Sequence, residues 1–172
     1  MTSLAEACVW AERPTAGGRL INARAESIAS SPAYRHSFRT KRCLIPADGF
    51  YEWLRTPSGR QPYYISAPDS CPLAFAGLWS TWHDRSSDIP PLRSCTIATT
   101  TPNPLMAQIH NRMPVILPPE AWDRWLDRRT DPGELLALLR PFTGDLVAYP
   151  VAPLVNNPRN QGPALVAPLP PA

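Results

Sequence analysis

The apolar positions of this chain fall into short runs that end at turns or prolines. The patterns in residues 73–82 (LAFAGLWSTW) and 93–101 (RSCTIATTT) are typical of strands. A turn at residues 56–59 joins the extended residues 43–54 to residues 61–66, which predicts a β-hairpin. Further short strands are expected at residues 113–117 and 146–151.

Helical spacing is confined to short segments. In residues 31–42, Tyr34 and Phe38 lie four positions apart and follow Ser31, which suits an N-cap. Further helical segments are expected at residues 103–109, at residues 131–140, and at residues 118–127 with Trp122, Trp125 and Leu126 on one face. Because strands and helices are interspersed without regular βαβ spacing, we predict a mixed α+β domain.

The length of 172 residues suits a single domain spanning residues 1–172. Proline makes up 23 of these residues, which predicts short elements and a Pro-rich surface tail over residues 153–172. No apolar run could cross a membrane, and the first residues carry no basic signal region. We therefore expect a cytoplasmic protein without membrane contacts.

Four cysteines are present, and no pair has CxxC spacing, so we expect no metal and no other cofactor. The net charge is only +3, and lysine occurs once, at position 41. The cations gather in one stretch that is opposed only by Glu26 and contains Arg19, Arg24, Arg35, Arg39, Lys41 and Arg42. A local basic stretch in a nearly neutral chain indicates one surface that faces an anion.

Two stretches bring polar groups into otherwise apolar surroundings. In residues 21–26, Asn22 and Arg24 alternate with small residues, so both would share one face of an extended strand, as in a site or in an ordinary edge strand. In residues 47–53, Glu52 is flanked by aromatic rings, a setting that raises a carboxyl pKa through desolvation. Trp53 would point to the opposite face, where it could stack on a base or fill the core.

A third stretch begins at Thr99 and continues to His110 and Arg112. The histidine is either a buried structural residue or a proton-transfer group beside an arginine that binds phosphate. Together, Asn22, Glu52 and His110 fit acid–base chemistry on an anionic substrate that carries rings.

Several separate motifs resemble the SRAP family, the SOS-response-associated peptidases. They run in order from about Trp10 to Asn160 as INARAES, RCLIPADGFYEW, FAGLW, ATTTPN, IHNRMPVIL and YPV…VNNPRN. The resemblance implies a bent pseudo-barrel β-sheet with flanking short helices. It also implies a monomer that binds single-stranded or abasic-site DNA and is associated with the nucleoid when bound to DNA. A self-processing peptidase activity is implied as well.

In the family, an N-terminal cysteine forms a covalent thiazolidine with the ring-opened abasic sugar. By resemblance, Asn22 would position the N-terminal residue, Glu52 would act as the acid–base group, and His110 would assist proton transfer at the sugar. DNA contacts are implied for Arg24, Trp10, Trp53, Thr99 and Arg112.

The opening of the sequence differs from the family pattern. Family members begin Met-Cys-Gly-Arg, whereas this chain begins Met1-Thr2-Ser3-Leu4. We therefore expect the catalytic cysteine to be missing. The explanations are a misassigned start, a truncated pseudo-enzyme or a split protein that another chain completes. In each case we expect no stable crosslink from this chain alone. The alternatives to crosslinking are a non-covalent damaged-DNA or single-strand binding module and a plain peptidase.

Overall fold

The computed structural model describes residues 20–83 and 90–170. These residues form two compact units that alternate along the chain. The described part of the first unit comprises residues 20–45, 74–83, 90–100 and 114–142, and that of the second comprises residues 46–73, 101–113 and 143–170. The single domain over residues 1–172 stays a prediction.

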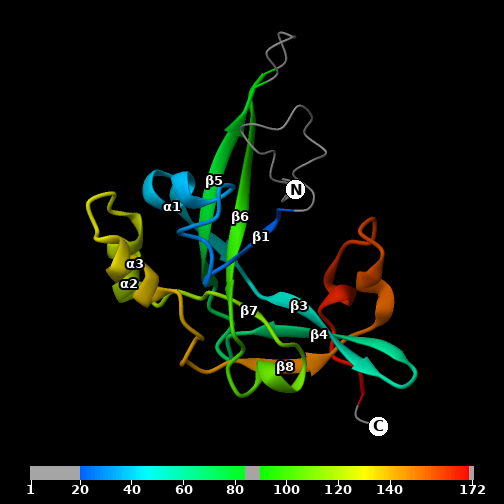
Figure 1. Cartoon of the computed structure of the whole chain (residues 1–172). Coiled ribbons are helices and arrows are strands. Elements are labelled where there is room, and N and C mark those ends of the chain that lie inside the picture. Colours follow the sequence, from blue (N-terminus) through cyan, green and yellow to red (C-terminus); the bar gives the residue numbers. More distant parts are fainter. Residues whose placement is uncertain (1–19, 84–89, 171–172) are drawn as a thin grey trace. The chain divides into compact units, whose positions relative to one another are not determined.

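The described strands form two sheets and no closed barrel (Figure 1). The larger sheet has the order β1-β6-β5-β2, with β7 also paired to β6. Its strands are β1 (Asn22–Arg24), β2 (Arg42–Ala47), β5 (Leu73–Trp82), β6 (Leu92–Thr100) and β7 (Met113–Pro114). The smaller sheet is antiparallel, with the order β3 (Phe50–Thr56), β4 (Gly59–Ser66) and β8 (Val147–Pro150). The mixed α+β class is thereby confirmed.

The core of the first unit lies between one face of β5 and β6 and three short helices, α1 (Arg35–Thr40), α2 (Pro119–Leu126) and α3 (Pro132–Leu138) (Figure 1). Alternate strand residues point into this core because successive side chains of a strand face opposite sides. The buried side chains include Phe38, Ala76, Leu78, Ala98, Trp125 and Leu135. Helix α1 begins at Arg35, later than predicted, but Tyr34 and Phe38 are buried as their spacing indicates.

Arg42 closes the ends of two helices in the first unit. Its side chain is only 8% exposed, and its guanidinium donates to the carbonyl oxygens of Phe38, Arg39, Trp125 and Asp127. Phe38 and Arg39 lie in the last turn of α1, Trp125 lies in the last turn of α2, and Asp127 directly follows α2. Carbonyl groups at the end of a helix have no partner within that helix, so they need another donor. The prediction that Arg42 faces an anion is therefore wrong, because its donors are taken up inside the protein.

In the second unit, the predicted hairpin is formed by β3 and β4, with Glu52 opposite Tyr63. Gly59 starts β4 with φ +136°, a conformation that favours glycine. Gly49 precedes β3, where a Cβ atom would collide with the Ile65 carbonyl and the Tyr64 ring. These two glycines fix both ends of the strand that carries Glu52.

The tail from Pro153 onward is mostly exposed and contains two 3-10 helices, η3 (Pro153–Asn156) and η4 (Pro163–Leu165). Two tyrosine hydroxyls of the smaller sheet hold it, since Tyr51 donates to the Leu165 carbonyl and Tyr149 to the Val166 carbonyl. The tail is therefore an ordered part of the second unit.

Candidate functional site

Glu52 lies in the middle of β3, and its side chain is 23% exposed. Burial raises the pKa of this carboxyl, and the His110 imidazole and the Trp53 backbone N–H offset part of that rise. The raised carboxyl pKa expected for Glu52 is therefore present. A carboxyl with a raised pKa exchanges its proton closer to neutral pH than an ordinary glutamate does.

His110 follows the short helix η2 (Met106–Gln108), whose first turn is held by the Asn103 side chain accepting from the Met106 N–H. The His110 N–H in turn donates to the Met106 carbonyl. This local framework places the His110 Nδ1 atom 3.6 Å from Oε2 of Glu52. Both residues belong to the second unit, so this contact lies within a single unit.

The Nδ1 atom of His110 can serve as donor or acceptor at this position. It lies 3.2 Å from the Arg112 backbone nitrogen, whose N–H it accepts when unprotonated. When protonated, it faces the Glu52 carboxylate and the Arg112 carbonyl. Glu52 and His110 therefore form a pair that can pass a proton between a carboxyl and an imidazole.

Because the pKa of Glu52 is raised in the folded protein, the free energy of unfolding is expected to depend on the ionisation of this carboxyl. Ionising the buried carboxyl lowers the free energy of unfolding. This loss is absent at pH values below the pKa of glutamate in the unfolded chain, and it grows as the pH rises toward the higher pKa of Glu52 in the folded protein. Glu52→Gln is therefore expected to stabilise the protein at neutral pH by about 1 kcal/mol. Urea unfolding at neutral pH and at about pH 4 measures this difference, which should shrink in acid. Equal stability of variant and wild type at neutral pH would contradict it.

A second group of predicted residues lies on β1 and β6 of the first unit. Asn22 and Arg24 are exposed on either side of the buried Ala23, and Arg24 is opposite Thr99 in the parallel register. The Tyr34 hydroxyl donates to the Asn22 carbonyl and fixes the edge strand. Because Asn22 belongs to the first unit, its meeting with the Glu52–His110 pair stays a prediction.

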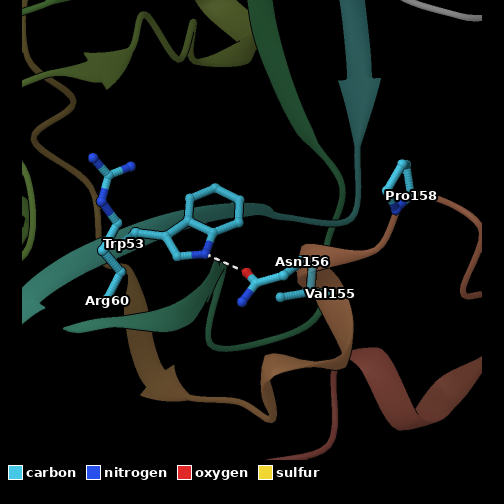
Figure 2. Close-up of a pocket in the computed structure, with 5 residues that line it drawn as sticks. All are labelled: Trp53, Arg60, Val155, Asn156 and Pro158. Carbon is cyan, nitrogen blue, oxygen red and sulfur yellow. Dashed lines mark hydrogen bonds between the residues drawn. The ribbon is translucent and has the colours of Figure 1, made fainter. Parts of the chain in front are cut away.

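Trp53 faces the side of β3 opposite Glu52. Its indole Nε1 donates to Oδ1 of Asn156 at 2.8 Å, and both residues line a pocket of about 500 Å³ (Figure 2). Arg60 of β4 lines the same pocket, together with Val155 and Pro158. Sequence reasoning found Trp53 but not Arg60 or Asn156, since nothing local marks residues that meet only in the folded chain. Trp10 lies outside the described residues.

Within residues 20–83 and 90–170, no three His, Cys, Asp or Glu side chains are grouped so as to hold a metal ion. Among the helices of the same residues, none is long and apolar enough to span a bilayer.

The sequence model of the family described as SOS response associated peptidase (SRAP) matches residues 6–158. The chain belongs to the SRAP family. Among its SRAP relatives, the abasic site processing protein YoqW of Bacillus subtilis is 46% identical over 160 residues, covering 91% of this chain and 70% of that protein. The abasic site processing protein HMCES of Xenopus tropicalis is 36% identical, covering 85% of this chain and 49% of that protein.

A more distant SRAP relative is the abasic site processing protein YedK of Escherichia coli, 29% identical over 93% of this chain and 70% of that protein. The fold is also similar to a crystal structure of a protein from Bacteroides thetaiotaomicron, with a TM-score of 0.87 and 28% identity over 96% of this chain and 75% of that one. The resemblance seen in the sequence motifs is thereby confirmed, and the abasic site processing proteins are homologues of this chain.

Proposed function

We propose that this chain binds single-stranded or damaged DNA and processes abasic sites. The observation that carries the proposal is the contact between the desolvated Glu52 carboxyl and His110, which supplies acid–base chemistry in a family whose relatives are named for abasic-site processing.

The chemistry at an abasic site needs proton transfer at each step. An amine adds to the C1′ aldehyde of the ring-opened sugar, forming a C–N bond while the aldehyde oxygen takes up a proton. The resulting carbinolamine loses water to give an imine, for which its oxygen must be protonated again. Protonated Glu52 would supply these protons, and His110 would take up the proton released by the amine.

The resemblance assigns the amine and a thiol to an N-terminal cysteine, whose sulfur adds to the imine carbon and closes a thiazolidine. Among the described residues, Cys71 is exposed, but its contacts with Asp69 raise the pKa of the thiol and so lower its thiolate fraction. Cys71 is therefore a poor substitute nucleophile. The peptidase activity named by the family would use the same acid–base pair.

We assign phosphate contacts to Arg24 and Arg112, with Thr99 beside Arg24 on the paired strand and Trp53 as a ring platform. Arg24 is exposed on the edge strand β1, where a phosphate can reach it. Trp10, outside the described residues, is assigned to the same DNA-binding set by the resemblance. Asn22 is assigned the positioning of the reacting N-terminal residue.

DNA binding is expected to weaken steeply with salt, because each phosphate contact releases condensed cations. Arg24→Ala should lower affinity for all sequences about equally and reduce the slope of log affinity against log salt by about 0.7. Fluorescence anisotropy over a salt series measures both quantities. The control Arg124→Ala changes an exposed arginine of α2, a helix with no assigned DNA contact, and should leave the slope unchanged. A flat salt response of the wild type would count against DNA binding.

The proposal is tested by incubating the protein with abasic single-stranded DNA and resolving the products on a denaturing gel, with and without borohydride. A heat-stable adduct without reductant would contradict the expectation that this chain alone forms no stable crosslink, and an adduct seen only with borohydride supports an imine. Preferential binding of abasic DNA with neither adduct would favour the non-covalent alternative. The proposed function fails if the protein neither binds nor modifies abasic DNA.

A further inference from the structure

The side of β3 that points away from Glu52 carries its own set of polar and aromatic groups. We propose that the pocket formed by Trp53, Arg60 and Asn156 is a nucleotide subsite, which holds one undamaged base of the bound strand and its phosphate. This inference rests on the proposed function, because it assigns a further part of the same DNA substrate to a second face of the strand that carries Glu52.

The amide of Asn156 has a fixed orientation. The Trp53 indole nitrogen can only donate, so the atom of Asn156 that lies 2.8 Å from it must be the oxygen. The amide nitrogen therefore points away from the indole (Figure 2). Within the described part of the chain, this nitrogen makes no hydrogen bond. The pocket thus offers two N–H donors to whatever enters it.

Arg60 adds a positive charge at the same pocket. It is exposed and lies directly opposite Arg55 across the β3–β4 hairpin. Two like charges facing each other across strands are unfavourable in the protein by itself. An anion bound between or beside them would remove this repulsion, and the guanidinium fork suits a phosphate.

The polar groups provided by Asn156 and Arg60 are all donors, so the ligand must present acceptors. A nucleobase does so through its carbonyl oxygens or ring nitrogens, and its plane can stack on the Trp53 indole. The volume of about 500 Å³ is large enough for one nucleotide. An acidic peptide would satisfy Arg60 but would leave the flat indole without a stacking partner.

The test uses the isotope-labelled full chain and an oligothymidylate without an abasic site. The wild-type Trp53 indole and Asn156 amide resonances, assigned by their loss in Trp53→Phe and Asn156→Asp, are expected to shift together on titration. Asn156→Asp keeps an oxygen for the indole but replaces the amide donor with a negative charge. It is expected to weaken binding about tenfold, as is Arg60→Gln, whereas the exposed control Arg140→Gln is expected to bind as the wild type does.

The inference is overturned if the wild type binds the oligonucleotide while Asn156→Asp and Arg60→Gln bind within about twofold of it. It is also overturned if oligothymidylate does not bind, or if an acidic peptide shifts both resonances as strongly. If the two resonances respond to the oligonucleotide but abasic DNA is neither preferred nor modified, the subsite stands and the proposed abasic-site function fails.

Discussion

Glu52→Gln is expected to slow formation of the borohydride-trapped imine with abasic single-stranded DNA about 100-fold, which is within the range attributed to general acid–base catalysis. Glutamine keeps the size and polarity of the side chain but cannot release or take up a proton. The carbinolamine oxygen would then depend on water for its proton. Single-turnover assays with borohydride trapping, resolved on a denaturing gel, measure the rate.

His110→Gln should cause a loss of similar size, and the double variant should be little slower than either single one, because the two residues pass the same proton. The matched control is Glu120→Gln, a change to an exposed acid of α2 that should leave the rate unaltered. Wild-type turnover by Glu52→Gln would remove Glu52 from the catalytic residues. Loss of activity together with the gain in stability expected above would separate a catalytic effect from misfolding.

Arg42→Met is expected to lower the free energy of unfolding by about 3–5 kcal/mol, since each buried carbonyl left without a donor costs about 1–3 kcal/mol. The variant leaves the carbonyl groups of Phe38, Arg39, Trp125 and Asp127 without the buried guanidinium that now donates to them. An unsatisfied buried acceptor costs its desolvation free energy, and the bonds to Phe38 and Trp125 are buried while those to Arg39 and Asp127 are partly buried. Urea unfolding followed by circular dichroism measures the change.

Arg39→Met is the control for this prediction, because the Arg39 side chain is exposed on the same helix and the change should cost less than about 0.5 kcal/mol. The free energy of unfolding of Arg42→Lys should lie between those of Arg42→Met and Arg39→Met, since an ammonium cannot reproduce the planar set of donors of the guanidinium. Equal stability of Arg42→Met and Arg39→Met would show that the two helix ends hold without the guanidinium.

The elements that the sequence predicted well are those whose signals are local. The strand at Leu73–Trp82 has the predicted bounds, and the turn before Gly59 joins the predicted hairpin. The desolvation of Glu52 was also predicted, because the apolar and aromatic residues of the same strand mark a segment that packs against other parts of the fold. In each case the signal lies within a few neighbouring residues of the sequence.

The failures concern contacts that join distant segments. Arg42 reads as one more member of a basic stretch until the carbonyls of Trp125 and Asp127 are placed beside it. Spacing also put Trp122 and Trp125 on one helix face, whereas α2 buries Trp125 and leaves Trp122 exposed. Which edge of a broad apolar stripe turns inward depends on the sheet below it, and no local pattern contains that information.

The alternation of the two units along the chain has a consequence for synthesis of the protein. The first unit cannot be completed until α3 has left the ribosome, and the second must wait for β8 and the tail. Contacts between such distant segments close long loops, which slows folding. Nascent chains that end before residue 132 would therefore lack α3 over the core of the first unit and would leave the edge of β4 without β8 in the second, and such products are expected to be substrates for proteolysis or aggregation.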